Sequence, residues 1–277
     1  MVGITLSGRL GNQMFQYAFG LMLIKQYNYT VFFIFHKQGL NKTILHRYFT
    51  LNSFSNTKNY FLYLFFKLLQ PKAKQIHLEN SNKYNTIQYN HIRSCIISGY
   101  FQSELYFKDI SHLIKKTFTI KKNYITDFNN KYHYLFKQNR TIAIHLRKGD
   151  YMLHGSEELG GQDISLPLSY YQKCLATIHN IEMYKIIFVS DEIEKTKKQF
   201  HFIPNAIFES NKDIIDFQIL MNADICIISN STFSWWAAYL NNKNKIIYAP
   251  KYWLGFKVNQ EYPVGIMSVN WKWMDVV

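Results

Sequence analysis

The sequence predicts an α/β protein of two lobes, each built on a mostly parallel β-sheet, and three observations support this prediction. From residue 140 onward, short apolar runs alternate with helix-like runs. An apolar run, a glycine-containing turn, a helix-like run and a second apolar run also open the chain. The length of 277 residues and the 48% hydrophobic content allow a substantial core in both halves. Strands that alternate with helices need cover on both faces, which favours parallel sheets.

The C-terminal lobe is expected to cover residues 136–277, and its alternation is regular enough for a Rossmann-type lobe. We expect strands at 141–146, 185–190, 206–209, 224–229 and 245–249. We expect the intervening helices at 168–180, 192–199, 213–222 and 232–241. Short apolar runs of this kind between helical runs are typical of strands that are buried on both faces.

The N-terminal lobe is expected to cover residues 1–135 and to be less regular. Its expected elements are a strand at 2–6, a helix at 14–27, a strand at 29–35, a strand ending at Gly99 and a helical region that reaches 119. Residues 40–93 are polar and aromatic without a clear period, so we expect short helices and loops there.

The formal net charge of +14 favours an anionic partner, and a nucleic acid, a phosphorylated substrate and an anionic membrane all satisfy this condition. Cys95, Cys174 and Cys226 stand far apart and match no metal-ligand spacing, so a reducing, cytoplasmic compartment is expected. The first residues do not have the pattern of a signal peptide.

The run YFLYLFFKLL at residues 60–69 comes nearest to a membrane segment. It is half as long as the roughly 20 residues that a spanning helix needs, and it contains Lys67. A helix in the core or lining a crevice is the more frequent explanation for such a run. The alternative is contact with a membrane surface, which would place the protein peripherally on the inner face of the membrane.

Polar groups follow two of the expected strands, at the ends where open α/β sheets bind ligands. HLRKGD follows the strand at 141–146, and SNSTFSWW follows the strand at 224–229 and opens a helix. A guanidinium at Arg147 would offer a bidentate fork to phosphate oxygens, and a helix N-terminus offers backbone N–H donors. Alone, Asn230 or Ser231 would be explained as an ordinary helix cap. Together with Arg147, they predict an anion site.

Three further features are less specific. Asp216 lies in a segment that is apolar on nearly every side, so it is either a surface acid or a buried acceptor for the N–H groups of a base such as guanine. GRLGNQ is a two-glycine turn that matches neither the dinucleotide fingerprint nor a phosphate-binding lysine loop. Trp235 and Trp236 are expected to pack in a helix rather than to stack on a sugar. The sequence contains no D-x-D pair, so it does not suggest a divalent metal ion that bridges diphosphate oxygens.

Four motifs together make the sequence recognisable, and these are GRLGNQMFQYAFG, SGYFQSELYF, HLRKGDY and SNSTFSWWAAYL. The sequence resembles the bacterial α-1,2-fucosyltransferases of glycosyltransferase family 11 from residue 8 to about 253, where APKYWLG also fits. The resemblance implies a GT-B fold, in which two Rossmann-like lobes face each other across a cleft. It implies GDP-β-L-fucose as donor, inversion at the fucose anomeric carbon, and no required metal or cofactor.

The resemblance also implies roles for residues of the C-terminal lobe. By position, Arg147 matches the arginine that grips the donor pyrophosphate, His145 the histidine that contacts the nucleotide, and Asp216 the acid that reads guanine. The segment expected against the phosphates consists of Ser231, Thr232 and Phe233.

In the N-terminal lobe, the resemblance implies a loop that closes on the diphosphate, formed by Arg9, Gly11 and Asn12. The general base stays open between Asp150, Glu104 and no strong base at all, and Asp150 has the alternative task of bracing the loop of Arg147. His154 lies in a glycine-rich loop that either reaches the acceptor or is only a surface loop.

The expected function is transfer of L-fucose to O2 of a terminal galactose, as in bacterial lipopolysaccharide O-antigen synthesis, and its expected partners are GDP-fucose and the acceptor glycan. One rival is a transferase of another donor or linkage. A second is a nucleic-acid-binding protein, but no binding motif is present and the basic residues are not confined to one segment. A third is a sugar-nucleotide binder without turnover.

Overall fold

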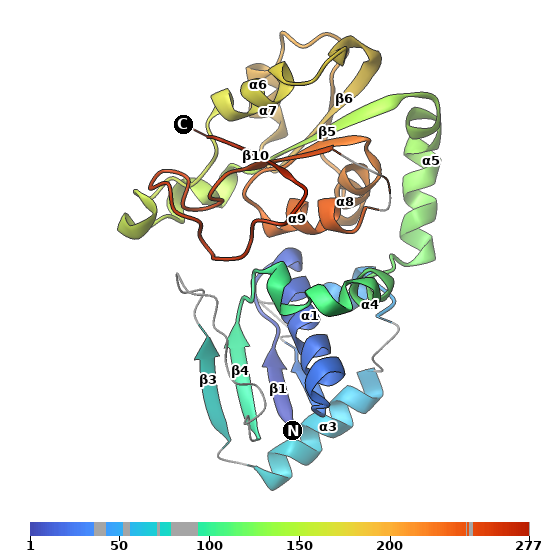
Figure 1. Cartoon of the computed structure of the whole chain (residues 1–277). Helices are drawn as coiled ribbons and strands as arrows, with labels where there is room; N and C mark the ends of the chain where they lie inside the picture. The colour runs from blue at the N-terminus through green and yellow to red at the C-terminus, as the bar shows by residue number, and fades with distance from the viewer. Residues whose placement is uncertain are drawn as a thin grey trace. The chain divides into compact units, whose positions relative to one another are not determined.

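The computed structural model describes residues 1–35, 43–51, 56–70, 73–78, 94–241, 243 and 246–276. The chain forms two compact units (Figure 1). The first consists of Met1–Lys121 with Pro263–Ile266, and the second of Lys122–Tyr262 with Met267–Val277. The prediction of an α/β protein with two parallel-sheet lobes is therefore confirmed.

The first unit contains a four-stranded parallel sheet in the order β2-β1-β4-β3. These strands are β1 (Val2–Thr5), β2 (Val31–Ile34), β3 (Lys74–Leu78) and β4 (Cys95–Gly99). Its helices are α1 (Leu10–Tyr27), α2 (Leu45–Tyr48), α3 (Asn56–Leu69), the 3-10 turns η2 (Glu104–Tyr106) and η3 (Lys108–Ile110), and α4 (Ser111–Thr117). Strand β3 was not predicted, because it is a mostly exposed edge strand with no apolar run.

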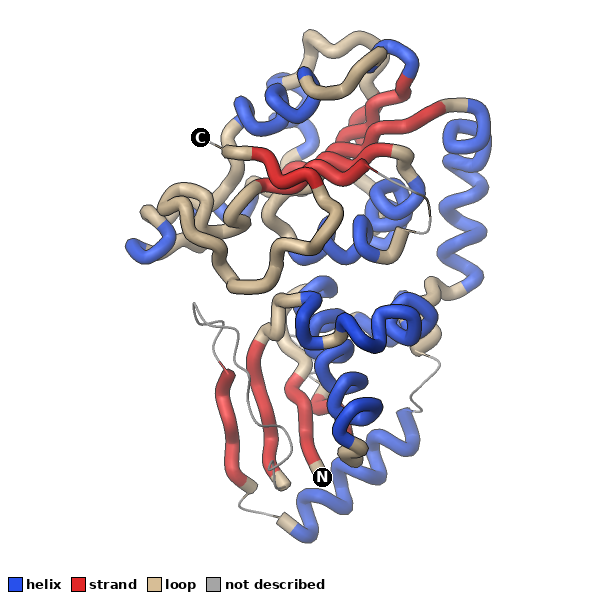
Figure 2. The backbone as a smooth tube through the Cα atoms, viewed as in Figure 1, coloured by secondary structure: helices blue, strands red, loops and turns tan. Residues whose placement is uncertain are grey.

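The second unit contains a six-stranded parallel sheet in the order β10-β9-β8-β5-β6-β7, drawn in red in Figure 2. Its strands are β5 (Arg140–Leu146), β6 (Tyr184–Ser190), β7 (Ile207–Glu209), β8 (Ile225–Ile227), β9 (Ile246–Pro250) and β10 (Lys272–Met274). The order reverses between β5 and β8, which is the position where doubly wound sheets bind ligands at the carboxyl ends of their strands.

The helices of the second unit cover this sheet. They are α5 (Lys122–Gln138), α6 (Leu168–Ala176), α7 (Ile193–Gln199), α8 (Asp213–Asn222) and α9 (Thr232–Tyr239), with 3-10 turns η4 (Gly149–Leu153), η5 (Glu157–Leu159) and η6 (Ile181–Met183). The observed boundary between the units differs from the expected one, because the position between 135 and 136 lies inside α5. Helix α5 belongs to the second unit, where the Gln218 side chain donates to the Tyr124 carbonyl at 3.0 Å.

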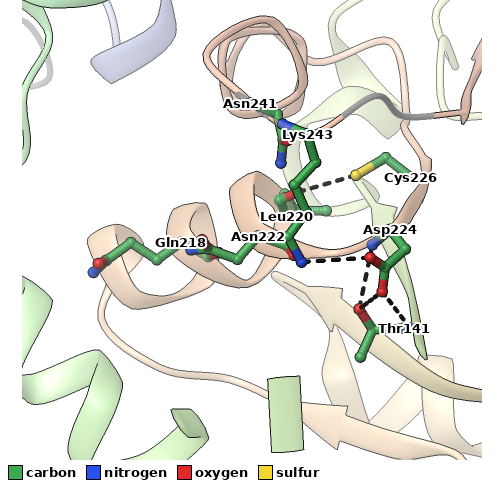
Figure 3. A network of polar contacts seen from close by, with 8 residues as sticks. All are labelled: Thr141, Gln218, Leu220, Asn222, Asp224, Cys226, Asn241 and Lys243. Atoms are coloured by element: carbon green, nitrogen blue, oxygen red, sulfur yellow. Dashed lines mark hydrogen bonds and ion pairs between the residues drawn. The ribbon is translucent and has the colours of Figure 1, made fainter. Parts of the chain in front are cut away.

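A polar network lies at the amino ends of β5 and β8 (Figure 3). The Asp224 carboxylate accepts from the backbone N–H of Thr141 at 2.8 Å and from its hydroxyl at 3.0 Å. The Lys243 ammonium lies 3.4 Å from Asp224 and donates to the Asn222 carbonyl at 3.0 Å. Partial burial raises the pKa of Asp224, but the bonds from Thr141 and the charge of Lys243 outweigh it, so the pKa is lowered overall. This network fixes β8 beside β5 and leaves the opposite ends of the strands for the ligand site.

Candidate functional site

His145 and Ser229 meet where β5 and β8 run side by side. The two strands pair Ile144 with Ile227, and just beyond this pair the His145 Nδ1 lies 2.8 Å from the Ser229 hydroxyl. Both side chains are buried. Burial and the neighbouring charge of Arg147 lower the pKa of His145 to about 3, so the imidazole is neutral at physiological pH. His145 can therefore exchange hydrogen bonds with a ligand but contributes no positive charge.

Arg147 is held by two carboxylates just beyond the end of β5. Its Nη2 lies 2.5 Å from an Asp150 oxygen and its Nη1 lies 3.0 Å from an Asp191 oxygen. Its guanidinium also lies over the Tyr151 ring, 5.4 Å from the centroid. Within the described part of the chain these two ion pairs use two of the five guanidinium N–H groups, and the other donors can bind an anion.

Asp191 is a site residue that the sequence analysis missed. It directly follows β6, and its second oxygen accepts from the backbone N–H of Lys148 at 3.1 Å. A Cβ atom at Gly149 would lie 2.5 Å from an Asp191 carboxylate oxygen, so a larger residue at this position would make the carboxylate shift. The signal that could have found Asp191 is an acid at the carboxyl end of a strand that neighbours β5.

The start of α9 lies next to the cluster formed by Arg147, Asp150 and Asp191. Ser231 occupies the cap position, but its side chain accepts no hydrogen bond from the first turn of the helix. The Asn230 amide instead donates to the Ile164 carbonyl at 2.8 Å, and the Tyr151 hydroxyl donates to the Asn230 carbonyl at 3.3 Å. Neither side chain acts as a helix cap, so the explanation that they only cap α9 does not fit.

Phe233 connects α9 with two other elements of the site. Its ring centroid lies 5.6 Å from that of His145 in β5 and 5.4 Å from that of Phe217 in α8. Thr232 and Phe233 are partly exposed. Of the predicted segment Ser231, Thr232 and Phe233, it is Phe233 that contacts His145.

Asp216 lies in the first turn of α8 and is buried, which excludes the surface-acid explanation. Its carboxylate accepts from the Asn211 side-chain amide at 2.8 Å and from the Asn211 backbone N–H at 3.2 Å. Burial raises the pKa of Asp216 to about 6, although the bonds from Asn211 oppose the shift. Glu209, which lies close by, also raises it and pairs with Lys131 at 2.8 Å.

The first unit brings two of the recognised motifs together. The Gln102 amide, from SGYFQSELYF, donates to the Asn12 side-chain oxygen at 2.9 Å. The preceding Gly8 has φ +73°, and a Cβ atom there would lie 2.7 Å from the Asn12 amide nitrogen. Arg9 is exposed and Gly11 is buried at the start of α1. Arg9 is therefore the N-cap of α1, and Gly11 and Asn12 lie in its first turn, shortly after the end of β1.

Glu104 also belongs to the first unit and is partly buried in η2. The preceding Ser103 hydroxyl accepts from the Leu105 N–H at 3.2 Å and donates to the Gly265 carbonyl at 2.8 Å. Asp150, the other base candidate, lies beside Arg147 in the second unit. His154 is exposed, and its Nε2 lies 3.4 Å from the second oxygen of Asp150.

The described part of the chain has neither a cluster of metal ligands nor a helix that could span a membrane. These residues contain no group of three or more His, Cys, Asp or Glu side chains arranged to hold a metal ion. Within the same residues, no helix reaches the length and hydropathy that crossing a bilayer requires.

Comparisons with known proteins decide the family. Residues 1–274 match the family model described as glycosyl transferase family 11. The chain belongs to glycosyltransferase family 11. The family resemblance predicted from the four sequence motifs is thereby confirmed, and the protein is a glycosyltransferase.

Two relatives of this family 11 glycosyltransferase come from Escherichia coli. The O-antigen biosynthesis glycosyltransferase WbnK is 28% identical over 90% of this chain and 93% of its own length. An α-1,2-colitosyltransferase is 25% identical over 91% of this chain and 92% of its own length.

Solved structures support the GT-B type of fold that the resemblance implies. POFUT1 in complex with GDP is similar at a TM-score of 0.54 and 14% identity, over 88% of this chain and 95% of that chain. The α-1,6-fucosyltransferase NodZ, soaked with GDP-fucose, is similar at a TM-score of 0.52 and 12% identity, over 86% of this chain and 91% of that chain. At this identity the similarity concerns the fold alone.

Proposed function

We propose that this glycosyltransferase transfers L-fucose from GDP-β-L-fucose to O2 of a terminal galactose, with inversion and without a metal ion. The observation that carries the proposal is the cluster at the adjacent ends of β5 and β8, where Arg147, His145 and the start of α9 converge. The named ligands of the similar structures, GDP and GDP-fucose, support this choice of donor.

The cluster suits a diphosphate because it offers donors of two kinds. Arg147 would direct its remaining N–H groups at phosphate oxygens, with Asp150 and Asp191 holding the guanidinium plane. The α9 N-terminus would add backbone N–H groups and positive partial charge. The neutral His145 adds a hydrogen bond without a further charge.

The proposed reaction is a single displacement. The galactose 2-hydroxyl forms a bond to fucose C1 while the bond from C1 to the β-phosphate oxygen breaks on the opposite face, and GDP leaves with that electron pair. Negative charge therefore grows on the β-phosphate in the transition state. Arg147 and the α9 N-terminus are preorganised to stabilise this charge, which is commonly the largest catalytic contribution.

The hydroxyl proton needs an acceptor, and Asp150 and Glu104 stay the two candidates. One Asp150 oxygen binds Arg147 and the other faces His154, so the geometry favours bracing of Arg147 as its main task. A loose transition state also asks little of the nucleophile, so a strong base is not a requirement of the proposal.

The deciding experiment incubates the enzyme with lactose and either GDP-fucose or GDP-colitose, and determines the product linkage by NMR. We expect fucosylation at O2 of galactose. Colitose is the second candidate, because one relative is an α-1,2-colitosyltransferase. It lacks the 3-hydroxyl of fucose, so a site that binds this hydroxyl would reject it. A strong preference for GDP-colitose, a different linkage, or GDP binding without turnover would each overturn the proposal.

Asp216 gives a pH prediction for donor binding. If its carboxylate accepts from guanine N–H groups, only the ionised form binds well. Because the pKa of Asp216 is raised to about 6, the dissociation constant for GDP-fucose should be constant above this pH and rise about tenfold for each unit below it. GDP-fucose is the right probe because it has no terminal phosphate that titrates in this range.

Asp216→Asn should bind GDP-fucose weakly at every pH and should lose the pH dependence between pH 5 and pH 7. Asp127→Asn is the matched control, since Asp127 is an exposed acid on the neighbouring α5 and should bind as the unchanged protein does. Titration calorimetry measures both variants. An unchanged pH dependence in Asp216→Asn would remove Asp216 from guanine recognition.

The biological acceptor is proposed as a bacterial O-antigen glycan, since one relative is an O-antigen biosynthesis glycosyltransferase. A cytoplasmic location is proposed with it, because Cys95, Cys174 and Cys226 are all free thiols in buried positions.

A further inference from the structure

Helix α3 is apolar on two faces, and among the residues that the structure describes only one of these faces is packed. The packed face covers the edge strand β2, where the Asn59 amide accepts from the Phe33 N–H at 2.6 Å and donates to the Phe33 carbonyl at 2.9 Å. Phe66 and Tyr63 pack on Phe32 with centroid separations of 4.8 and 5.9 Å. This face explains why the helix stays on the first unit. It does not explain the other apolar face.

The second face of α3 exposes six large apolar side chains. Leu68 is 81% exposed, Phe61 is 64% exposed and Phe65 is 54% exposed. At 3.6 residues per turn these side chains follow one another along about half of the helix circumference. The complete exposed set consists of Tyr60, Phe61, Leu64, Phe65, Leu68 and Leu69. Six exposed large apolar side chains on one helix face, in a protein with well-buried cores, indicate a site of interaction.

Lysines lie near both edges of this face. On the helical wheel, Lys67 precedes Tyr60 and Lys58 lies between Phe65 and Leu69, and both lysines are exposed. Sequences that bind membrane surfaces combine aromatic and leucine side chains with a basic border in this way. The expectation that this run is a core or crevice-lining helix is therefore met by only one of its faces.

The charge of the chain is concentrated in the unit that carries α3. Residues 1–78 contain no Asp or Glu. Residues 1–121 contain fifteen Lys and Arg against three Asp and Glu, a formal net charge of +12, and residues 263–266 add none. The rest of the chain has a net charge of only +2. A charge asymmetry of this kind favours an anionic partner for the first unit.

We propose that the exposed face of α3 docks on an anionic lipid bilayer, with the six apolar side chains in the interface and the lysines at the headgroups. Phe, Tyr and Leu suit the boundary between headgroups and acyl chains, and anionic lipids complement the charge. A second copy of the chain would bring two units of +12 together, which repel each other. A nucleic acid would complement the charge, but half of the six exposed side chains are leucines, which offer its bases no ring to stack on.

The test is co-sedimentation with vesicles of 70% phosphatidylethanolamine and 30% phosphatidylglycerol, compared with vesicles of pure phosphatidylcholine. We expect binding to the anionic vesicles that weakens with salt. Phe61→Ser/Phe65→Ser/Leu68→Ser should lower the partition coefficient by at least about tenfold. Tyr134→Ser/Met183→Ser/Phe202→Ser is the matched control, since it removes three exposed apolar side chains from the second unit, and it should bind as the unchanged protein does.

Two further measurements distinguish membrane docking from an effect on the active site and from binding of other partners. Lys58→Gln and Lys67→Gln should each weaken binding by about fivefold. Transfer of sugar to soluble lactose should be unchanged in the α3 variants, because α3 contains none of the proposed site residues. Equal binding to neutral and anionic vesicles, or unchanged binding of the triple α3 variant, would overturn the proposal. Loss of a dimer in sedimentation velocity, or of nucleic-acid binding, without an effect on vesicles would assign the face to one of those partners instead.

Discussion

Arg147→Ala is expected to fold and to lower kcat by about 100- to 1000-fold, which corresponds to roughly 2.7–4 kcal/mol of transition-state stabilisation. The structure fixes this guanidinium between Asp150 and Asp191 at the end of β5. Charge that develops on the departing β-phosphate would lose this partner. Backbone donors at α9 would remain, so activity should fall steeply without vanishing.

Two other arginine variants make this measurement specific. Arg147→Lys keeps the charge but loses the planar fork, so it should recover only part of the lost rate. Arg140→Ala removes an arginine from the opposite end of the same strand, where it lies 4.5 Å from the centroid of the Tyr184 ring. Its kcat should be unchanged. A folded Arg147→Ala enzyme with nearly full kcat would exclude Arg147 from the reaction.

Asp191→Asn belongs to the same series, because it removes one of the two charges that orient Arg147. If Asp191 positions the guanidinium, kcat should fall by up to about 100-fold while the KM for the acceptor stays nearly constant. Asp191→Glu should restore part of the rate. A parallel loss of folding in both variants would instead assign Asp191 a structural task.

The two halves of the cluster could be predicted from the sequence because each is a local pattern. His145 and Arg147 stand at the end of one apolar run. Ser231 and Thr232 open a helix that follows a second apolar run. No local pattern shows that β5 and β8 are neighbours, and this adjacency follows only from the Rossmann-type strand order expected for the lobe. The observed order β10-β9-β8-β5-β6-β7 is this order, with the reversal between β5 and β8.

The missed elements lacked local patterns of the expected kind. Strands β3 and β10 are short and partly exposed, so neither has a continuous apolar run. Helix α5 has a polar composition, and its signal is an aromatic stripe at every fourth position, formed by Tyr124, Phe128, Tyr132 and Phe136. Because this stripe was missed, the expected boundary between the lobes fell inside the helix.

Trp235→Ala is expected to destabilise the second unit by about 3–5 kcal/mol. Trp235 has no exposed surface, and its ring centroid lies 4.9 Å from that of Tyr239 and 5.5 Å from that of Trp271. The predicted packing of Trp235 and Trp236 is confirmed, since both are fully buried. Removal of Trp235 leaves a large cavity under α9, the helix whose start forms part of the proposed anion site.

Urea unfolding followed by tryptophan fluorescence measures this effect in the second unit alone, because all five tryptophans lie in that unit. Trp271→Ala is the matched control, and it should cost less because Trp271 is partly exposed. If Trp235 stacked on a sugar instead, its removal would raise KM and leave the free energy of unfolding unchanged. Loss of stability with a secondary loss of donor affinity would show that the packing beneath α9 holds the anion site in place.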